Sequence, residues 1–385
     1  MPGLLPHIDP DGLLEYSVVY TDRALNHMSD RFGHVMRDIA SVLRQTYGAR
    51  SVAVVPGSGT FGMEAVARQF ATGRPVLVLR NGWFSYRWSQ ILQAGSIATS
   101  ETVLKARPDG PGAQAVWSPA PVREVVAAIR ARRPAVVFAP HVETSAGMLL
   151  TDDYLREVGQ ATREVGGLFV VDAIASGAVW VDMAATGIDV LVSAPQKGWS
   201  GSPCCAFVML GERARAALDA TASTSFAADL RRWCQVMESY ESGSHAYHAT
   251  LPTDALARTR DAMLETRDLG LAALRDAQFA LGDAVRERLR SRGYESVAAR
   301  GWQAPGVVVC HTDDPALHSG RAFAEAGLQT AAGVPLQCDE AAGFRTFRIG
   351  LFGIDKLRHP QRTVAALDRA LDAAGAAVPA ARVAA

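Results

Sequence analysis

The sequence predicts an α/β protein with an open, mostly parallel central sheet and a smaller C-terminal α+β domain. Three observations predict this fold class: the length of the chain, a series of short apolar runs, and the amphipathic stretches between them. At 385 residues the chain exceeds one ordinary domain and indicates a large domain with a smaller partner. The runs are almost continuously hydrophobic, which is typical of parallel strands covered on both faces.

Six of these runs are expected to be buried strands. They lie at residues 51–55, 75–79, 135–139, 168–172, 189–193 and 205–210. Amphipathic stretches between them predict helices at 62–70, 122–131 and 152–165. Because strands and helices alternate along the chain, we expect the strands to form one open, mostly parallel sheet.

The second part of the chain has a different pattern. A long helical segment from Pro252 to about Arg292 precedes a strand at 306–311, a helix, a strand at 344–349 and a last helix at 354–373. We place the domain boundary in the long helix. The three predicted units are an N-terminal arm near the active site (1–25), a large domain (26–260) and a small C-terminal domain (261–385). The alanine-rich tail after Ala374 is expected to fray.

The composition excludes several classes of function. The 39 basic and 39 acidic residues give a net charge of zero, and no basic block indicates nucleic-acid binding. The five cysteines form no CxxC pair and no set with metal-ligand spacing, so we expect no metal and a reduced, intracellular protein. Residues 1–15 lack the layout of a signal peptide, and no apolar run approaches ~18 residues. These features predict a soluble, cytoplasmic protein.

Lysine is rare in this chain, and its rarity singles out one position. Only three of the 39 basic residues are lysine (Lys105, Lys197 and Lys356), which leaves 36 arginines. A guanidinium stays protonated, whereas a desolvated ammonium can lose its proton and attack a carbonyl. Lys197 follows the predicted strand 189–193, where active sites of α/β proteins lie. Lys105 and Lys356 lie in polar, Arg-flanked stretches and are interpreted as solvated.

A glycine-rich turn, PGSGTFG at residues 56–62, follows the first predicted strand and precedes a helix. Its glycines fit G-x-G-x-x-G, in which backbone N–H groups at a helix N-terminus can approach a phosphate. The next strand ends in Arg80 and Asn81 rather than in an acid for the ribose of NAD. An NADP-dependent dehydrogenase therefore stays an alternative, as does a turn that binds no ligand.

Asp172 ends the predicted strand 168–172, and burying a carboxylate there is costly without a cationic partner. The protonated ring nitrogen of pyridoxal 5'-phosphate (PLP) is such a partner, and the carboxylate keeps the ring an electron sink. A helix N-cap is the alternative role. Lys197 follows 25 residues later. Together with the glycine turn, the two residues supply a phosphate cradle, a partner for the ring nitrogen and an imine-forming amine. Gln196 can add an amide donor to the phosphate.

Seven motifs in order resemble the class V aminotransferases of fold type I, nearest to the alanine–glyoxylate and serine–pyruvate branch. The motifs are PGSGTFGMEA (56–65), VLVLRNGWFSYRW (76–88), HVETSAG (141–147), VVDAIAS (170–176), SAPQKGWSGSP (193–203), YHATLPTDAL (247–256) and FRIGLFG (347–353). The resemblance covers residues from about 26 to 373. It implies a seven-stranded sheet and PLP as cofactor. It also implies transamination between a small, alanine- or serine-like amino acid and a 2-oxo acid such as glyoxylate or pyruvate.

The resemblance also implies a role for each matching residue. Besides Lys197 and Asp172, the residues expected to hold PLP are Ser58, Gly59, Thr60 and Gln196 at the phosphate, Phe84 and Ile174 on the ring faces, Thr144 near the ring hydroxyl, and Tyr247 and Thr250 from a neighbouring subunit. The last two imply a homodimer with shared active sites. Trp83 competes with Phe84 for the stacking position. Arg348 would bind the substrate carboxylate bidentately, with a surface-strand arginine as the alternative.

The opening segment departs from the family, whose Thr-Pro-Gly-Pro-like segment lines the substrate pocket. Here residues 8–16 read IDPDGLLEY, so Glu15, Tyr16 and Arg23 are candidates for setting the specificity. A PLP-dependent lyase or desulfurase stays an alternative, because the bond that breaks depends on its alignment with the ring. A desulfurase needs a mobile catalytic cysteine, for which Cys338 is the candidate; an ordinary loop cysteine is the other interpretation.

Overall fold

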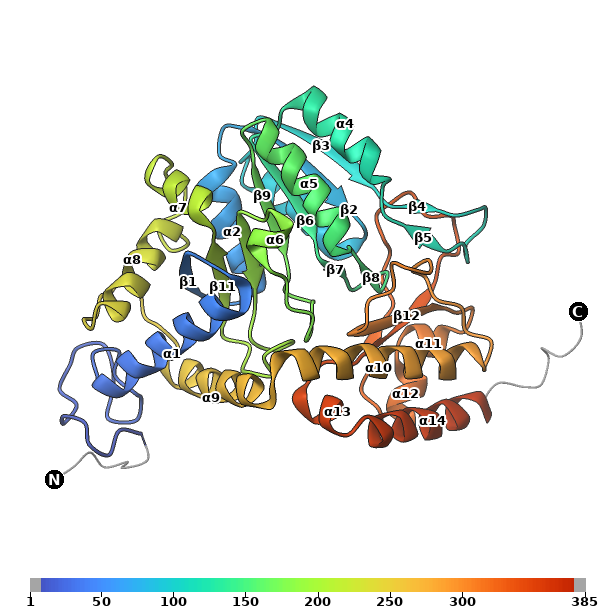
Figure 1. Cartoon of the computed structure of the whole chain (residues 1–385). Coiled ribbons are helices and arrows are strands. Elements are labelled where there is room, and N and C mark those ends of the chain that lie inside the picture. Colours follow the sequence, from blue (N-terminus) through green and yellow to red (C-terminus); the bar gives the residue numbers. More distant parts are fainter. Residues whose placement is uncertain (1–7, 377–385) are drawn as a thin grey trace, which may run out of the picture.

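A computed structural model describes residues 8–376, and its centre is a seven-stranded sheet (Figure 1). The strands run in the order β1-β11-β10-β9-β6-β2-β3. Their bounds are β1 (Ser51–Pro56), β2 (Pro75–Arg80), β3 (Ser100–Lys105), β6 (Val136–Pro140), β9 (Leu168–Asp172), β10 (Val190–Ser193) and β11 (Cys205–Leu210). Only β11 runs antiparallel to its neighbours. The predicted fold class, with a mostly parallel seven-stranded sheet, is confirmed.

The edge strand β3 is the one strand of this sheet that the sequence did not predict. Four of its six residues are polar or charged, and all six stay partly or fully exposed. An edge strand pairs on one side only and faces less of the core, so it lacks the apolar run by which the others are recognised. The six predicted strands agree with the structure to within one residue at each end.

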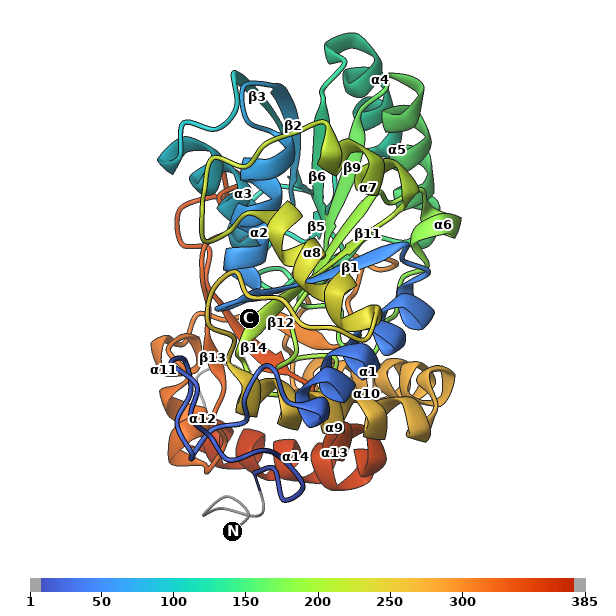
Figure 2. The ribbon, with the colours of Figure 1, turned by 90° about the vertical axis from the view of Figure 1, so that its left-hand side faces the viewer.

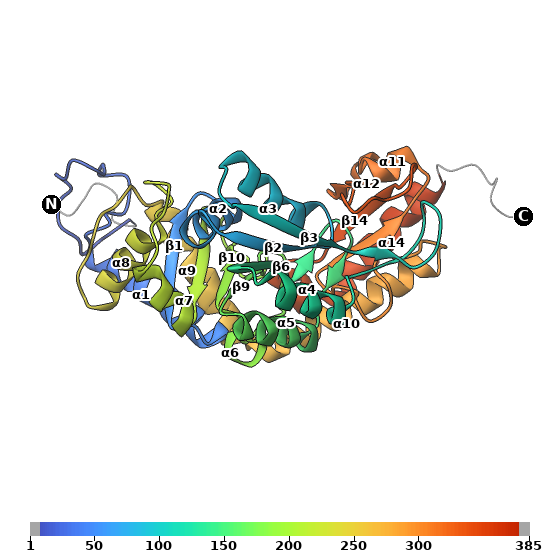
Figure 3. The same cartoon turned by 90° about the horizontal axis from the view of Figure 1, so that it is seen from above.

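Helices cover both faces of the sheet (Figure 3). α2 (Gly59–Phe70) and α3 (Trp83–Ala94) lie on one face, and α4 (Val122–Arg132) and α5 (Asp152–Glu164) lie on the other. Sheet and helices share one hydrophobic core. This double cover explains why the central strands are continuously apolar.

At the β1 edge, α1 (Asp30–Tyr47) and α8 (Leu230–Glu241) pack beside the sheet (Figure 2). The N-terminal arm lies at this same end of the molecule, opposite the C-terminal sheet (Figures 1 and 3). The Tyr20 hydroxyl in the arm donates a hydrogen bond of 3.1 Å to the carbonyl of Leu251. The arm therefore contacts the loop that leads from α8 to α9. The short helices α6 (Met183–Thr186) and α7 (Glu212–Asp219) complete this part of the chain.

The helix predicted over 252–292 is divided into α9 (Thr253–Leu269) and α10 (Leu271–Arg290). Gly270 between them has φ 90° and ψ 114°, a conformation outside the helical region that favours glycine. The last predicted helix is likewise divided, into α13 (Ile354–Arg358) and α14 (Pro360–Ala376), because Pro360 cannot continue the preceding helix.

The C-terminal part has a sheet of its own, in the order β12-β14-β13, with a separate hydrophobic cluster. The remaining elements are β12 (Val307–His311), β13 (Ala331–Ala332), β14 (Thr346–Gly350), α11 (Pro315–His318), α12 (Arg321–Glu325), and the short pairs β4 (Arg107–Pro108) with β5 (Trp117–Ser118) and β7 (Val142–Glu143) with β8 (Met148–Leu149). The division of the chain at residues 25 and 260 stays a prediction. Most of the alanine-rich tail lies outside the described residues. Within residues 8–376, none of the helices combines the length and apolar character needed to cross a bilayer.

Candidate active site

Residues from distant stretches of the sequence meet at one edge of the sheet, where β1, β9 and β10 end. Ser58 follows β1, Asp172 ends β9 and Lys197 follows β10. These residues line a cavity of about 120 Å³. Nine of the twelve residues predicted for the site line this cavity: Ser58, Gly59, Thr60, Phe84, Thr144, Asp172, Ile174, Gln196 and Lys197. Tyr247, Thr250 and Arg348 do not.

The glycine turn after β1 leads directly into α2, which begins at Gly59. Ser58 is the N-cap residue, but its side chain makes no capping hydrogen bond, and the first turn contains no acid. The N–H groups at this helix end therefore suit an anion such as a phosphate. A Cβ at position 59 would lie 2.4 Å from Cδ1 of Ile174, so only glycine lets the turn approach Ile174 this closely.

Two further cavity residues carry buried polar atoms that find no hydrogen-bond partner within the described part of the chain. These atoms are Oγ1 of Thr144 and Oε1 of Gln196. Burying a polar atom without a partner costs free energy, and native proteins leave few such atoms. The two atoms therefore indicate that a polar ligand completes the cavity.

Asp172 is buried at the bottom of the site, and burial raises the pKa of its carboxyl group to about 6. Its Oδ1 accepts a hydrogen bond of 2.9 Å from the backbone N–H of Ile174. Among residues 8–376 it forms no ion pair. The N-cap alternative is wrong, because the chain after Asp172 continues in turns and the next helix begins only at Met183. The carboxylate is therefore free to pair with a cationic ligand.

Lys197 enters the cavity because the chain packs closely just beyond it. Trp199 is fully buried and anchors the segment after β10. A Cβ at Gly198 would lie 2.3 Å from the carbonyl oxygen of Gly177, so only glycine permits this close approach. The position next to the lysine is thus fixed by packing on both sides.

Burial lowers the pKa of the Lys197 ammonium. The nearby carboxylate of Asp172 opposes this shift, whereas the guanidinium of Arg348 adds to it. Nζ lies 5.5 Å from the centre of the Phe352 ring. A lysine in this setting releases its proton more readily than a solvated one, and its neutral amine is a nucleophile and a base.

Phe84 lines the cavity, whereas its competitor Trp83 does not. The backbone N–H of Phe84 donates to Oε1 of Glu143 at 3.2 Å, and that of Ser85 donates to Oε2 at 2.8 Å. Glu143 is completely buried and thus caps the start of α3 from β7. This role of Glu143 was not predicted from the sequence, in which Glu143 is only one residue of the HVETSAG motif.

Two guanidinium groups lie near the Phe84 ring. Cζ of Arg348 is 5.5 Å from the ring centre, and Cζ of Arg87 is 5.3 Å from it. Arg87 lines the cavity and donates a hydrogen bond of 3.1 Å to Oγ1 of Thr60. Arg87 was not predicted from the sequence, although its position three residues after Phe84 places both on one side of α3. Arg348 is half-buried, and burial lowers its pKa, so it is not a freely solvated arginine.

The aminotransferase class-V family matches residues 13–324, which is most of the chain. The chain belongs to the class V aminotransferases. It is 31% identical to the 2-aminoethylphosphonate–pyruvate transaminase of Burkholderia ambifaria, over 93% of this chain and 90% of that protein. It is 32% identical to the protein of the same name from Burkholderia thailandensis, over 88% of each chain. The solved alanine–glyoxylate aminotransferase of Nostoc sp. shares the fold, with a TM-score of 0.76 and 26% identity over 90% of this chain and 88% of that one.

This class V aminotransferase is PLP-dependent and moves an amino group between an amino-acid-like donor and a keto acid. The resemblance stated from the motifs is confirmed. The dehydrogenase alternative finds no support among these relatives.

Cys338 does not have the properties of a mobile catalytic cysteine in this aminotransferase. It is buried, and burial raises the pKa of its thiol to about 12. Its Sγ donates to the backbone carbonyl of Arg80 at 3.3 Å. Lys105 is partly exposed, and its Nζ forms an ion pair of 2.7 Å with Asp339 at the surface. Lys356 is exposed, as expected from its polar surroundings.

Tyr247 and Thr250 lie in the loop between α8 and α9 and do not reach the cavity of their own chain. Their hydroxyl groups are 3.0 Å apart, and 54% of Tyr247 is exposed. The ring of His27 packs 5.5 Å from that of Tyr247. Both hydroxyl groups therefore lie at the surface of the chain.

The residues of the opening segment proposed to set specificity also lie away from the cavity of their own aminotransferase chain. Glu15 accepts a hydrogen bond of 2.7 Å from the backbone N–H of Ser17 and another of 2.6 Å from Asn26. Tyr16 is largely exposed, and Arg23 is exposed as well. Glu15 therefore shapes the arm itself, and a role for Tyr16 or Arg23 in specificity stays a prediction.

Proposed function

We propose that this aminotransferase takes its amino group from a small, alanine- or serine-like amino acid and passes it to pyruvate or glyoxylate. The proposal is carried by one observation: a buried amine and a buried carboxylate, Lys197 and Asp172, line one cavity. Arg348 lies beside that cavity, where its guanidinium can bind the acidic group of the donor with two parallel hydrogen bonds.

The cavity residues fit PLP. The uncapped start of α2 suits the phosphate, and the unpartnered oxygens of Thr144 and Gln196 can bond polar groups of the cofactor. Among the described residues the buried carboxylate of Asp172 forms no ion pair, and a protonated ring nitrogen can supply its cationic partner. When bound, PLP supplies an electron sink for the negative charge left on the donor carbon.

Lys197 is the residue that we expect to move the proton. Because burial lowers its pKa, the neutral amine is more available near neutral pH, and Nζ can accept the α-proton of the donor and return it. Asp172 moves no proton in this scheme; its carboxylate holds the ring nitrogen in the charged form. Phe84 and Ile174 line the cavity with apolar surface that keeps water from the reacting atoms.

A second candidate donor is 2-aminoethylphosphonate, which appears in the names of both bacterial relatives described above. A specific feature of the site favours it. Two guanidinium groups, those of Arg87 and Arg348, lie within 5.5 Å of the Phe84 ring centre, and a phosphonate can carry two negative charges. A single carboxylate needs only one of these cations.

A donor assay tests both candidates. The PLP-loaded enzyme would be given alanine with glyoxylate, and serine or 2-aminoethylphosphonate with pyruvate. We expect equal amounts of keto product and aminated acceptor, and the donor with the highest kcat/KM decides between the candidates. Release of ammonia without an aminated acceptor would show elimination and would contradict the proposal.

A homodimer with shared active sites is part of the proposal. The hydroxyl groups of Tyr247 and Thr250 are exposed and lie outside their own cavity, as expected for residues that reach the phosphate of a partner. Large apolar side chains are exposed in the arm and in a nearby loop, and such groups mark an interface. They are Leu13, Leu14, Tyr16, Val18 and Phe226. The five cysteines are all unpaired, which favours a reducing compartment such as the cytoplasm.

A further inference from the structure

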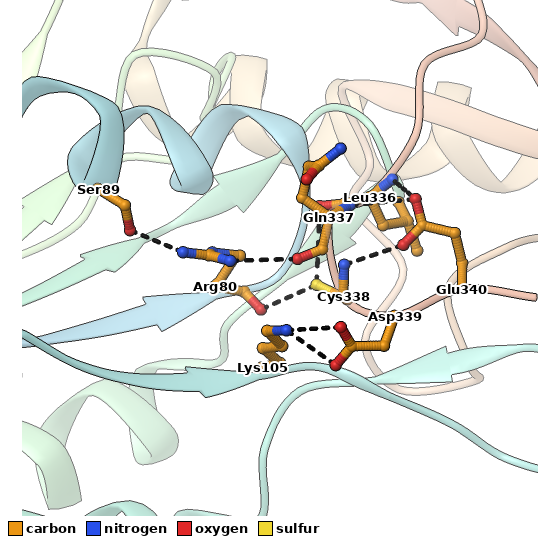
Figure 4. A network of polar contacts seen from close by, with 8 residues as sticks. All are labelled: Arg80, Ser89, Lys105, Leu336, Gln337, Cys338, Asp339 and Glu340. Carbon is orange, nitrogen blue, oxygen red and sulfur yellow. Dashed lines mark hydrogen bonds and ion pairs between the residues drawn. The ribbon is translucent and has the colours of Figure 1, made fainter. Parts of the chain in front are cut away.

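A loop of the C-terminal sheet is fixed to the end of the large sheet (Figure 4). Residues 335–340, which we name the Cys338 loop, lie in the connection from β13 to β14. The same connection leads into Arg348, which is on β14. The loop thus joins the part of the chain that carries Arg348 to the part that carries the cavity.

Glu340 holds the Cys338 loop in an unusual conformation. Its carboxylate accepts hydrogen bonds from the backbone N–H groups of Leu336 (2.7 Å), Gln337 (3.1 Å) and Cys338 (2.9 Å). Gln337 and Asp339 have φ angles of 62° and 66°, in the left-handed region that residues other than glycine seldom adopt. A single carboxylate therefore organises a backbone that would not adopt this shape by itself.

The Cys338 loop contacts the ends of two neighbouring strands of the large sheet (Figure 4). At the end of β2, the Cys338 thiol donates to the backbone carbonyl of Arg80 (3.3 Å), and the Arg80 guanidinium donates to the carbonyl of Gln337 (3.4 Å). At the end of β3, Nζ of Lys105 contacts both carboxylate oxygens of Asp339, at 2.7 and 2.8 Å. Each strand end is therefore tied to the loop.

The contacts of the Cys338 loop are linked to the active site in two ways, through Arg80 and through the strands that carry Arg348. Arg80 is followed four residues later by Phe84, whose ring lies 5.5 Å from Cζ of Arg348. On the other side, Nε of Arg348 donates to the carbonyl of Ala332 in β13 at 2.7 Å. Arg348 is thus held by β13, and the connection between β13 and β14 is fixed to the large sheet through the contacts of the Cys338 loop with Arg80 and Lys105.

We propose that Glu340, Asp339 and Lys105 are positioning residues that place Arg348 at its working distance from the Phe84 ring. None of them lines the cavity. They act through Arg348 on the affinity for the acidic group of the substrate. This inference rests on the proposed role of Arg348, and the experiment below separates the two.

The test is the steady-state kinetics of loop variants of the PLP-loaded enzyme. For Glu340→Ala we expect KM for donor and acceptor to rise about tenfold, because small misplacements of a binding group are costly, while kcat and the visible absorbance of the bound cofactor stay unchanged. Asp339→Asn should have the same effect more weakly, because Asn also tolerates the left-handed conformation. Lys105→Arg should keep the ion pair and behave like the wild type. Glu325→Gln, which breaks an exposed ion pair with Arg321 on α12, is the matched control and should change nothing.

A double-mutant cycle with Arg348→Ala identifies the route of the effect. If the Cys338 loop acts through Arg348, Glu340→Ala raises KM in the wild type and has no further effect in the Arg348→Ala background. An equal rise in both backgrounds overturns the inference. An unchanged KM in Glu340→Ala overturns the inference but leaves the role of Arg348 intact. An unchanged KM in Arg348→Ala alone overturns that role and the inference with it. If Glu340→Ala does not fold, the same cycle is run with Asp339→Asn.

Discussion

At the scale of single residues, the environment of Lys197 matters as much as its chemical type. We expect Lys197→Arg to retain the fold but to lose nearly all turnover, because a guanidinium stays protonated and cannot act as the base. General acid–base groups contribute about 10²–10⁴-fold, so activity should fall below ~1% of the wild type. Single-turnover assays with a purified donor would measure this. Lys356→Arg replaces an exposed lysine, is the matched control, and should be fully active.

Asp172 gives a prediction about pH that needs no activity assay. Its pKa is raised from 3.8 to about 6 by burial, so the cofactor-free fold prefers the neutral carboxyl group. A raised pKa contributes stability below the unfolded value that is lost as the pH rises through the folded value. Between pH 4 and about 6 the wild type should therefore lose roughly 1–3 kcal/mol of unfolding free energy that Asp172→Asn does not lose. The measurement is urea unfolding of both cofactor-free proteins across this pH range. If the free energy of unfolding changes with pH equally in both proteins, Asp172 does not have the raised pKa.

The same Asp172→Asn variant should bind PLP but turn over slowly. An amide has nearly the same shape as the carboxylate and lacks the charge that holds the ring nitrogen protonated. We expect the barrier to rise by several kcal/mol, as for other preorganised electrostatic groups. A turnover rate near that of the wild type would mean that Asp172 has no catalytic role.

Site residues could be predicted from the sequence where a local pattern marks them, and not where their role depends on contacts made in the folded chain. Asp172 ends an apolar strand and Lys197 follows another, and this local pattern can be recognised in the sequence alone. Glu143 and Arg87 act through contacts with α3 and Thr60 that form only when the chain is folded. Glu143 lies in the HVETSAG motif, and Arg87 lies one helical turn from Phe84. Neither signal indicated which group the side chain contacts.

At the scale of elements, the start of α2 gives a test of the cofactor cradle. We expect Gly59→Ala to weaken PLP binding, because the new Cβ would push the Ile174 side chain into the cavity. Overpacking of this kind costs about 1–3 kcal/mol. Fluorescence titration of the cofactor-free protein with PLP measures the loss. Adding Ile174→Val removes Cδ1, the nearest atom at 2.4 Å, but leaves Cγ1 at 2.9 Å, and should therefore restore part of the affinity. Gly211→Ala, in another turn from strand to helix, meets its nearest atom at 3.5 Å and is the control.

Apolar patterns in the sequence located the elements whose residues are buried. They did not reveal an element or a helix break that does not depend on burial. Six strands were found because both of their faces are covered, whereas β3 was missed because it is a polar edge. The break at Gly270 was missed because the apolar pattern continues on either side of it. A glycine in the sequence does not by itself show whether its backbone adopts a conformation that ends a helix.

At the scale of the whole molecule, the shared site can be tested by mixing inactive chains. Lys197→Ala chains lack the amine, and Tyr247→Phe/Thr250→Ala chains should lose cofactor, which must be shown first. In a mixed dimer one site carries both lesions and the other carries neither. Random re-association should restore about a quarter of the wild-type activity. If mixtures stay inactive although differently tagged heterodimers are isolated, Tyr247 and Thr250 serve the site of their own subunit.

The scarcity of lysine has a practical consequence for coupling this enzyme to other materials. Amine-directed reagents meet three lysine side chains, of which Lys197 is buried and Lys105 is held in an ion pair. Of the three, Lys356 on α13 is the most exposed and is the preferred target. Attachment through Lys356 would fix the protein by helix α13 and leave the arm and the α8–α9 loop free. Immobilisation could therefore be oriented without introducing a new reactive residue.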